Sequence, residues 1–324
     1  MMLFASYRSL AVVAGLGLSI LLPAGLLADA PAAAPTIQVT QRTFATPENA
    51  VDALRAATTA GDKAALAEIF GPDFHSLATG DPVQDAHNAQ RFAIEMQQVC
   101  QQVSNEDQSI TLEVGTNHWP MPIPLVKVDG QWLFDTAAGK DEIINRHIGK
   151  DELHAIGVCR AYVLAQKHHA EADAQGRYAL TFASTAGTND GLFWPATPNS
   201  APSPFGPRVA ESQIGIEGGH EGPGAQPFHG YYFKILSRQG PDAPGGKMDY
   251  LCHHQLTGGF ALVAYPEHWD QSGVMTFIVG QEGKVYQKNL GPATRRIVWK
   301  MKEFDPDETW TLVLEEGVEH ASEH

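Results

Sequence analysis

Several motifs of catalysis and cofactor binding are missing from this sequence of 324 residues. There is no Gly-x-Ser-x-Gly nucleophile elbow, no phosphate-binding Gly-x4-Gly-Lys-Ser/Thr loop, no Gly-x-Gly-x-x-Gly after a predicted strand and no His-Glu-x-x-His zinc helix. We therefore predict no catalytic residues, no metal site and no cofactor. Because a catalytic triad is defined by geometry and not by spacing, an aligned nucleophile, histidine and carboxylate, or three side chains converging on a metal, would overturn this prediction.

Cysteine and positive charge are both scarce. The sequence contains only three cysteines, Cys100, Cys159 and Cys252, and their wide separation gives no metal-ligand spacing. At most one intramolecular disulfide can form, and all three pairings stay open, although Cys159 and Cys252 fall within one predicted domain. The 22 Lys and Arg residues against 37 Asp and Glu residues give a formal net charge of -15, which disfavours nucleic acid and anionic lipid as partners.

The N-terminus has the three parts of a secretory signal peptide. Arg8 precedes an apolar run over 10–27, and small residues follow it. The run is about long enough for a membrane anchor, but Pro23 and Gly25 interrupt it and no basic stop-transfer cluster follows. We therefore predict a cleaved signal peptide over 1–30, an extended leader over 31–42, and a periplasmic or secreted protein without a stable membrane anchor.

The first predicted domain, 43–140, is helix-first α+β. Thr46-Pro47 is typical of a helix N-cap followed by proline at the first helical position, and Asp129-Gly130 is typical of a two-residue hairpin turn. Helices are predicted over 46–60, 63–70 and 85–103, and strands over 109–114 and 125–134. This order and the Gly-Gln-Trp-Leu-Phe strand resemble the cone-shaped fold of the nuclear-transport-factor-two-like superfamily, which implies a pocket.

Aromatic and histidine side chains form the predicted ligand site of this cone-like domain. They are Phe74, His75, His118, Trp119 and Trp132. Aromatic walls with one or two polar groups suit a small ligand. Ordinary core and rim positions are the alternative interpretation. If the pocket is catalytic, His118 or Asp135 is the expected general base.

The second predicted domain, 141–316, combines a long helix with an antiparallel sheet. Between them lies a Pro/Gly-rich arm over 184–228, whose seven prolines and eight glycines predict no regular element. The arm either grips a partner or packs on the sheet as an irregular layer. The predicted elements are a helix over 141–172, strands over 230–236, 258–265, 274–279 and 284–288, a helix over 293–304, a strand over 310–314 and an acidic tail over 317–324.

Two metal hypotheses stand beside the prediction of no metal. The segment 171–178, with Glu171 and Asp173, has the acidic spacing of a degenerate calcium loop. Phe182, however, stands where a bidentate Glu would close the cage. The second hypothesis joins Cys252, His253 or His254 with His229. Solvated or hydrogen-bonded histidines are the favoured interpretation of the two adjacent pairs, His168-His169 and His253-His254.

Four segments resemble an uncharacterised secreted bacterial family, domain of unknown function 2950. They are Trp-Pro-Met-Pro-Ile-Pro-Leu-Val at 119–126, His-Gly-Tyr-Tyr-Phe-Lys-Ile-Leu at 229–236, Gly-Gly-Phe-Ala-Leu-Val-Ala-Tyr-Pro at 258–266 and Gly-Val-Met-Thr-Phe-Ile-Val at 273–279. The resemblance covers nearly all of the mature chain and implies export and an unknown role, with no catalytic residues to transfer. The second domain is also similar to the globular heads of type IV pilins and pseudopilins, although its long helix is internal and amphipathic.

These observations favour an exported, non-catalytic binding or assembly factor that contacts another envelope protein through its acidic surface or its 184–228 arm. The alternative is a small-molecule binder or hydrolase that uses the pocket of the cone-like domain. A disulfide-linked oligomer is a third hypothesis.

Overall fold

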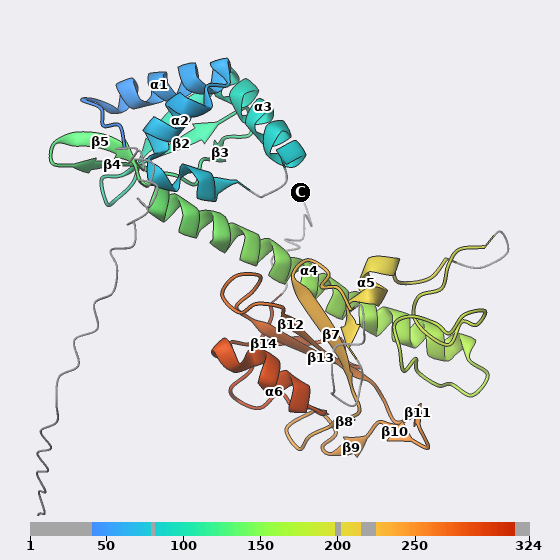
Figure 1. Cartoon of the computed structure of the whole chain (residues 1–324). Coiled ribbons are helices and arrows are strands. Elements are labelled where there is room, and N and C mark those ends of the chain that lie inside the picture. The colour runs from blue at the N-terminus through green and yellow to red at the C-terminus, as the bar shows by residue number, and fades with distance from the viewer. Residues whose placement is uncertain (1–40, 79–81, 198–201, 215–224, 315–324) are drawn as a thin grey trace, which may run out of the picture. The chain divides into compact units, whose positions relative to one another are not determined.

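The computed structural model describes residues 41–78, 82–197, 202–214 and 225–314 (Figure 1). Helices and antiparallel sheets occur together in these ranges, so the predicted α+β class is confirmed. No helix in the described ranges is long and apolar enough to cross a membrane. The predicted signal peptide and the predicted acidic tail lie outside the described residues.

Helices open the described chain, largely as the capping residues predict. They are α1 (Pro47–Ala60), α2 (Lys63–Phe70), the 3-10 helix η1 (Pro72–Leu77) and α3 (Pro82–Gln98). The Thr46 side chain accepts a hydrogen bond from the Asn49 amide at 3.3 Å, which caps α1. The prediction that the third helix continues to Val103 is wrong. Residues 100–104 instead pair with a neighbouring strand, which satisfies their backbone groups as well as a helix would.

The first sheet is antiparallel and follows the helices. Its strands are β1 (Cys100–Ser104), β2 (Ile110–Val114), β3 (Trp119–Pro120), β4 (Leu125–Val128) and β5 (Gln131–Phe134), in the order β1-β2-β4-β5 with β3 also paired to β2. Asp129 and Gly130 have φ values of 49° and 81°, as the predicted type I′ turn requires. The buried side chains of this sheet and of α1–α3 form one apolar cluster, whose most buried members are Ala50, Leu54, Ile69, Leu112, Val114, Leu125 and Phe134.

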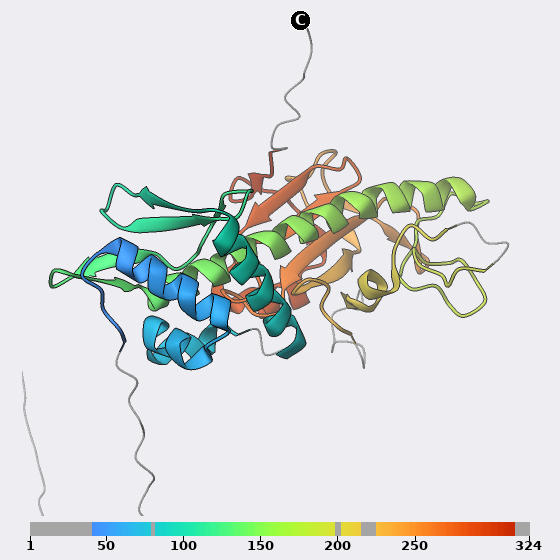
Figure 2. The same cartoon turned by 90° about the horizontal axis from the view of Figure 1, so that it is seen from above.

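The long helix α4 (Thr136–Ala172) contacts elements before and after it in the chain (Figures 1 and 2). It begins earlier than the predicted residue 141, because the Asp135 carboxylate accepts a hydrogen bond from the Ala138 amide and caps the helix. Its first half contacts η1, and its second half packs on β12, β13 and β14 of the second sheet. The second half therefore belongs to the core that holds the candidate site.

The second sheet has the order β16-β14-β13-β12-β7-β6. Its strands are β6 (Gln213–Ile214), β7 (Tyr231–Leu236), β12 (Ala261–Pro266), β13 (Thr276–Gly280), β14 (Val285–Lys288) and β16 (Thr311–Leu312). The four central strands are antiparallel, as predicted, and every residue of β7, β12 and β13 is buried. Side chains therefore pack on both faces of the sheet, which explains the continuous apolar runs in the sequence.

Side-chain contacts show what covers each face of this sheet. Phe233 points to Phe182, which packs against Tyr162 of α4. The next residue, Lys234, points to the opposite face, where its Nζ donates hydrogen bonds of 3.1, 2.9 and 2.9 Å to three carbonyls at the C-terminal end of α6 (Thr294–Lys300). This buried ammonium thus caps the C-terminal end of α6, and α6 ends before the predicted residue 304.

The Pro/Gly-rich arm is partly regular, so the prediction of no regular element over 184–228 is wrong. Its described part contains α5 (Pro207–Glu211) and β6, and β6 pairs parallel to β7. Leu192 and Phe205 are buried, and the Phe205 ring lies 4.9 Å from that of Phe182. These apolar anchors fix the described arm on a second apolar cluster, formed with the second sheet and the second half of α4, which we call the second core.

Short strands complete the fold beside the second sheet. They are β8 (Arg238–Gln239), β9 (Met248–Asp249), β10 (Leu251–Cys252), β11 (Gln255–Leu256) and β15 (Glu303–Phe304), and the 3-10 helix η2 (Gly291–Ala293) precedes α6. They form a three-stranded sheet, β15-β8-β9, and the two-stranded hairpin β10-β11.

Candidate metal centre

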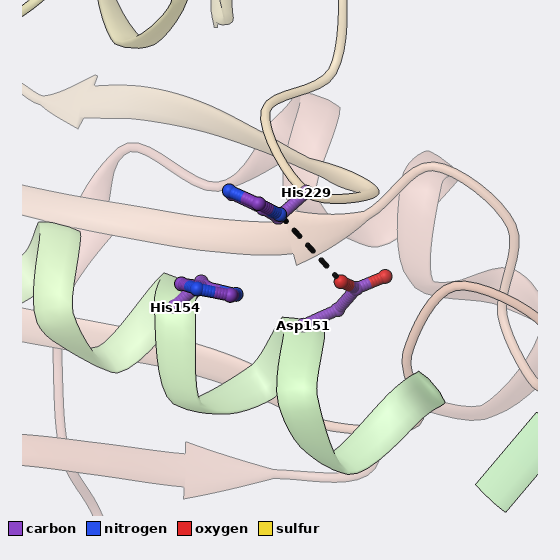
Figure 3. Close-up of side chains that lie close together, drawn as sticks. All are labelled: Asp151, His154 and His229. Atoms are coloured by element: carbon purple, nitrogen blue, oxygen red, sulfur yellow. Dashed lines mark ion pairs between the residues drawn. The ribbon is translucent and has the colours of Figure 1, made fainter. Parts of the chain in front are cut away.

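Three side chains from α4 and from the turn before β7 converge at one place (Figure 3). Asp151, His154 and His229 each offer one ligand atom, and these atoms lie within 4.8 Å of one another. It is the one group of three such His, Cys, Asp or Glu side chains in the described part of the chain. Two imidazoles and one carboxylate are ligands that zinc and related transition metals accept.

The helical spacing of α4 builds half of this site. His147, Asp151 and His154 are four and three residues apart, so their side chains lie along one face of the helix. Asp151 is only 3% exposed. Its Oδ2 lies 3.2 Å from His147 Nε2, whereas its Oδ1 lies 4.0 Å from His229 Nδ1. His147 thus holds one carboxylate oxygen and leaves the other facing the cluster.

A tight turn before β7 supplies His229. His229 and Gly230 have φ values of 46° and 65°, and backbone hydrogen bonds of 2.9 and 3.1 Å close the turn over residues 228–231. This geometry is that of a type I′ turn, which favours glycine. A Cβ atom at position 230 would also lie 2.6 Å from the Ser272 Cβ and 3.0 Å from the Asp151 Oδ2. Glycine therefore allows the turn to bring His229 close to α4.

The two imidazole rings lie face to face and leave one nitrogen without a partner. The ring centroids of His154 and His229 are 3.8 Å apart at an interplanar angle of 14°. His154 Nδ1 is buried and makes no hydrogen bond. A buried polar atom without a partner costs about 1–3 kcal/mol. Metal bonds of ~2.0 Å would place the ligand atoms roughly 3.3 Å apart, so binding would splay the stacked rings and give His154 a partner.

Desolvation shifts the protonation of the buried Asp151 and of the exposed His229 toward the neutral form. Desolvation raises the pKa of Asp151, although the nearby histidines, His147 first, and Lys150 oppose the shift. Desolvation also lowers the pKa of His229, and repulsion from His154 adds to this effect while Asp151 opposes it. The His229 imidazole is therefore neutral at neutral pH and can donate a lone pair to a metal. A divalent cation would also offset the cost of burying the Asp151 carboxylate.

The neighbouring carboxylate of Glu152 is already occupied. Its Oε1 accepts hydrogen bonds from the amides of Val274 and Met275, both at 2.9 Å. This contact ties α4 to the segment that leads into β13. Glu152 Oε1 therefore acts as a structural anchor between α4 and this segment.

The residues predicted to line a pocket in the cone-like domain pack against different partners. Phe74 stacks on a neighbouring phenylalanine at 6.0 Å, and His75 beside it is exposed. Trp119 meets the Phe92 ring edge-on at 6.4 Å, whereas Trp132 lies under a lysine ammonium at 5.9 Å. A ligand role for these residues stays a prediction.

Both general bases predicted for that domain have structural partners. His118 Nδ1 lies 3.2 Å from the Glu113 carboxylate. Asp135 caps α4, as described above. These contacts account for the two side chains without a ligand.

The three cysteines are all free. The structure contains no disulfide between Cys159, which is buried in the second core, and Cys252, which is exposed. Burial raises the pKa of the Cys159 thiol to about 12. The Cys252 Sγ lies 3.2 Å from His253 Nδ1 in the β10-β11 hairpin.

The two metal hypotheses from the sequence do not match the geometry. His229 groups with Asp151 and His154, not with Cys252 and its neighbouring histidines. In the calcium-like segment, the Asp173 carboxylate binds the Arg177 guanidinium at 2.7 Å. An arginine therefore takes the place that a cation would need.

His147, Asp151 and His154 are not among the site residues predicted from the sequence. Their spacing on a predicted helix was a visible signal, because it places all three on one face. A search for His-Glu-x-x-His does not find it, because here the two histidines are seven residues apart and the carboxylate is an aspartate four residues after the first. His229-Gly230 before a strand was a second signal, typical of a turn with positive φ.

Comparison with known proteins places the chain in a family without adding residue roles. No curated protein and no solved structure matches it. Residues 41–313 match the family model described as a protein of unknown function, DUF2950. The matched span contains both apolar cores and the candidate metal centre. The resemblance of the four sequence segments is thus confirmed, and the chain belongs to the DUF2950 family.

Proposed function

We propose that this protein binds a divalent transition metal of the zinc type through Asp151, His154 and His229. The observation that carries the proposal is the buried His154 Nδ1, which has no hydrogen-bond partner in a cluster of potential metal ligands. The neutral His229 and the buried carboxylate of Asp151 supply the other ligand atoms. A nitrogen-rich set with one carboxylate favours zinc and its neighbours over magnesium or calcium, which prefer oxygen ligands.

A metal-dependent hydrolase is the second candidate. Three protein ligands leave a coordination position for water, as in catalytic zinc sites. Binding is favoured over hydrolysis because the nearby Glu152 carboxylate already accepts two backbone hydrogen bonds. A hydrolase would also need a proton acceptor beside the metal-bound water.

The test is metal titration of the purified mature chain after chelator treatment. Co²⁺ should bind with one-to-one stoichiometry and give visible absorption bands, and Zn²⁺ should displace it. His154→Ala and His229→Ala should lose binding, whereas His168→Ala, an exposed histidine on α4, should retain it. Equal Co²⁺ binding by His154→Ala and the unaltered protein would refute the site. Turnover of ester or phosphoester substrates that is lost in His154→Ala would favour the hydrolase.

We also propose that the protein works outside the cytoplasm, as its signal-peptide pattern indicates. The partner is then another envelope protein or a small ligand, with the 184–228 arm and the acidic surface as contact regions. Cell fractionation and N-terminal sequencing of the mature protein test export. Recovery of an uncleaved chain from the cytoplasm would refute it.

The finer fold relations belong to this proposal as well. We infer that residues 43–140 form a cone-like domain of the nuclear-transport-factor-two-like type and that the long helix with the second sheet is related to pilin heads. The helix-first order and the packing of α4 on an antiparallel sheet support these relations. An experimental structure compared with both fold types would test them.

A further inference from the structure

A cavity of about 350 Å³ lies on the second sheet beside the C-terminal end of α6. It is lined by side chains of β8, of β13, of the segment 300–305 and of Trp310, which precedes β16. Small-molecule sites in proteins enclose roughly 300–1,000 Å³. A neighbouring cavity beside Phe304 measures only about 30 Å³, which holds little more than a water molecule. The larger of the two cavities therefore has room for a small organic molecule.

Apolar side chains form the floor of the larger cavity. Ile278 lies in the same cross-strand row as Lys234, whose ammonium meets the end of α6, so it faces the side of the sheet on which α6 packs. The row continues through β14 to Leu312, and Trp310 stands two residues before it, which places the indole on the same side. Met301, directly after α6, lies beside them. Ile278 is buried, whereas Met301 and Trp310 are half-buried and offer apolar surface to a ligand.

The charged groups that line the cavity do not balance. They are the cations Arg238, Lys300 and Lys302 and the carboxylates Glu303 and Asp305. Arg238 Nε lies 2.9 Å from Glu303 Oε1, so these two charges offset each other. Asp305 Oδ1 accepts a hydrogen bond of 2.8 Å from a backbone amide. Lys300 and Lys302 are exposed, and neither ammonium forms an ion pair or a hydrogen bond with the described residues. The lining therefore has one positive charge in excess.

The segment that borders the cavity is basic along its whole length. Residues 284–302 contain six Lys and Arg residues and no Asp or Glu, although the chain has a formal net charge of -15. Carboxylates adjoin the segment at both ends, and they have partners. Glu282 lies 3.6 Å from the Lys284 ammonium, and the Asp307 carboxylate accepts a hydrogen bond from the Thr309 amide at 2.8 Å. This excess of cations favours an anion near the cavity.

We propose that this cavity binds a small organic monoanion of the aromatic carboxylate class. The aromatic body packs on Ile278, Met301 and Trp310, because an indole offers a flat apolar surface to another ring. The carboxylate faces the two lysines, whose ammonium groups donate charge-assisted hydrogen bonds. A volume near the lower limit of small-molecule sites suits a body of fused rings better than a long acyl chain.

This site is independent of the candidate metal centre. It lies on the side of the second sheet where α6 packs, and α4, which supplies Asp151 and His154, covers the other side. The two sites share no residue. A failure of the metal titration would therefore leave this inference standing, and the reverse also holds.

The experiment is isothermal titration calorimetry of the purified mature chain with naphthoate as the probe. Naphthoate should bind with one-to-one stoichiometry and a Kd below about 1 mM. The neutral naphthamide and the acyclic decanoate should bind more weakly, since the first lacks the charge and the second lacks the rings. Added salt should weaken naphthoate binding, because it screens the attraction to the ammonium groups.

Two variants locate the site on opposite parts of the ligand. The double variant Lys300→Gln/Lys302→Gln should raise the Kd for naphthoate roughly five- to tenfold and leave naphthamide binding unchanged. Trp310→Leu should weaken both probes by at least about threefold. The matched controls are Lys167→Gln on α4 and Trp119→Leu on β3, which replace exposed side chains far from the cavity in the sequence, and both should bind naphthoate as the unaltered protein does.

Three results would overturn the proposal. The first is no heat of binding with naphthoate at about 1 mM. The second is equal binding of naphthoate and naphthamide, or tighter binding of decanoate, because either would refute the aromatic carboxylate class. The third is naphthoate binding that stays unchanged in the double lysine variant, whose exposed positions allow substitution without loss of the fold, because the anion would then bind elsewhere.

Discussion

Replacement of Asp151 by asparagine separates the metal-binding role of this side chain from its structural role. In the unaltered protein, zinc at about 100 times its Kd adds about 2.7 kcal/mol to the free energy of unfolding. For proteins of this size, each kcal/mol raises the melting temperature by roughly 2–4 °C. Zinc should therefore raise the melting temperature of the second core by roughly 5–10 °C. Asp151→Asn should lose nearly all of this gain, because a neutral amide is a poor ligand for zinc.

Without metal, the same substitution should have the opposite effect. Burial raises the pKa of Asp151 in the folded state above its ordinary value of 3.8. The folded protein then holds this proton more firmly than the unfolded chain does, so the carboxyl group lowers stability as the pH rises from 3.8 through the folded pKa. The cost is complete at neutral pH. Metal-free Asp151→Asn should thus be at least as stable as the unaltered protein at neutral pH, and this advantage should shrink on acidification.

Differential scanning calorimetry of both proteins, with chelator and with zinc, measures these effects at neutral and mildly acidic pH. The reasoning is refuted if metal-free Asp151→Asn melts well below the unaltered protein at neutral pH. That result would show that attraction between Asp151 and the histidines around it outweighs the cost of burial. An equal zinc shift in both proteins would place the metal at another site.

Three further changes probe the surroundings of the site and the core. His147→Ala removes the group that holds one oxygen of the proposed carboxylate ligand, and should weaken Co²⁺ binding roughly 10- to 100-fold at unchanged stoichiometry; an unchanged Kd would contradict this role. Gly273→Ala would place a methyl group against the buried Tyr231 hydroxyl and should cost roughly 1–3 kcal/mol in chemical denaturation. Gly157→Ala is the control, because a Cβ atom at this position of α4 would meet open space, and it should raise the free energy of unfolding by about 0.5–1 kcal/mol. Equal denaturation midpoints for the two variants would argue against tight packing at Gly273. A thiol reagent should label Cys252 in the folded protein but Cys159 only after denaturation, and mass spectrometry showing early labelling of both would contradict the buried placement.

Local rules predicted the elements whose geometry a few neighbouring residues determine. Thr46-Pro47 starts α1 because the threonine hydroxyl and the proline ring act within one turn. Asp129-Gly130 forms a hairpin turn because both residues tolerate positive φ. These elements need little help from the rest of the chain, so a sequence pattern is sufficient to find them.

Elements that depend on distant partners were harder to predict. Residues 100–104 follow a helix directly and became strand β1 through pairing with β2. The Pro/Gly-rich arm contains β6 because β7 offers an unpaired edge, and Phe205 holds it on the second core. In both places tertiary contacts decide the backbone conformation, and composition does not encode them.

The candidate site combines a pattern that sequence can reveal with one that it cannot. The face shared by His147, Asp151 and His154 follows from helical spacing alone. The approach of His229 depends on the turn before β7 and on the space left by Gly230. Only the folded chain shows that a histidine from a distant turn completes the set.

The convergence of Asp151, His154 and His229 weakens the prediction, made from the sequence, that the protein has no metal site. The three side chains do not by themselves make an enzyme. Hydrolysis at a metal needs a group that accepts a proton from bound water. Glu152 lies next to the centre, yet its carboxylate anchors the amides of Val274 and Met275. Its release would uncouple α4 from the segment that enters β13. Metal binding requires only that the stacked rings of His154 and His229 separate. Binding therefore requires less structural change than catalysis would.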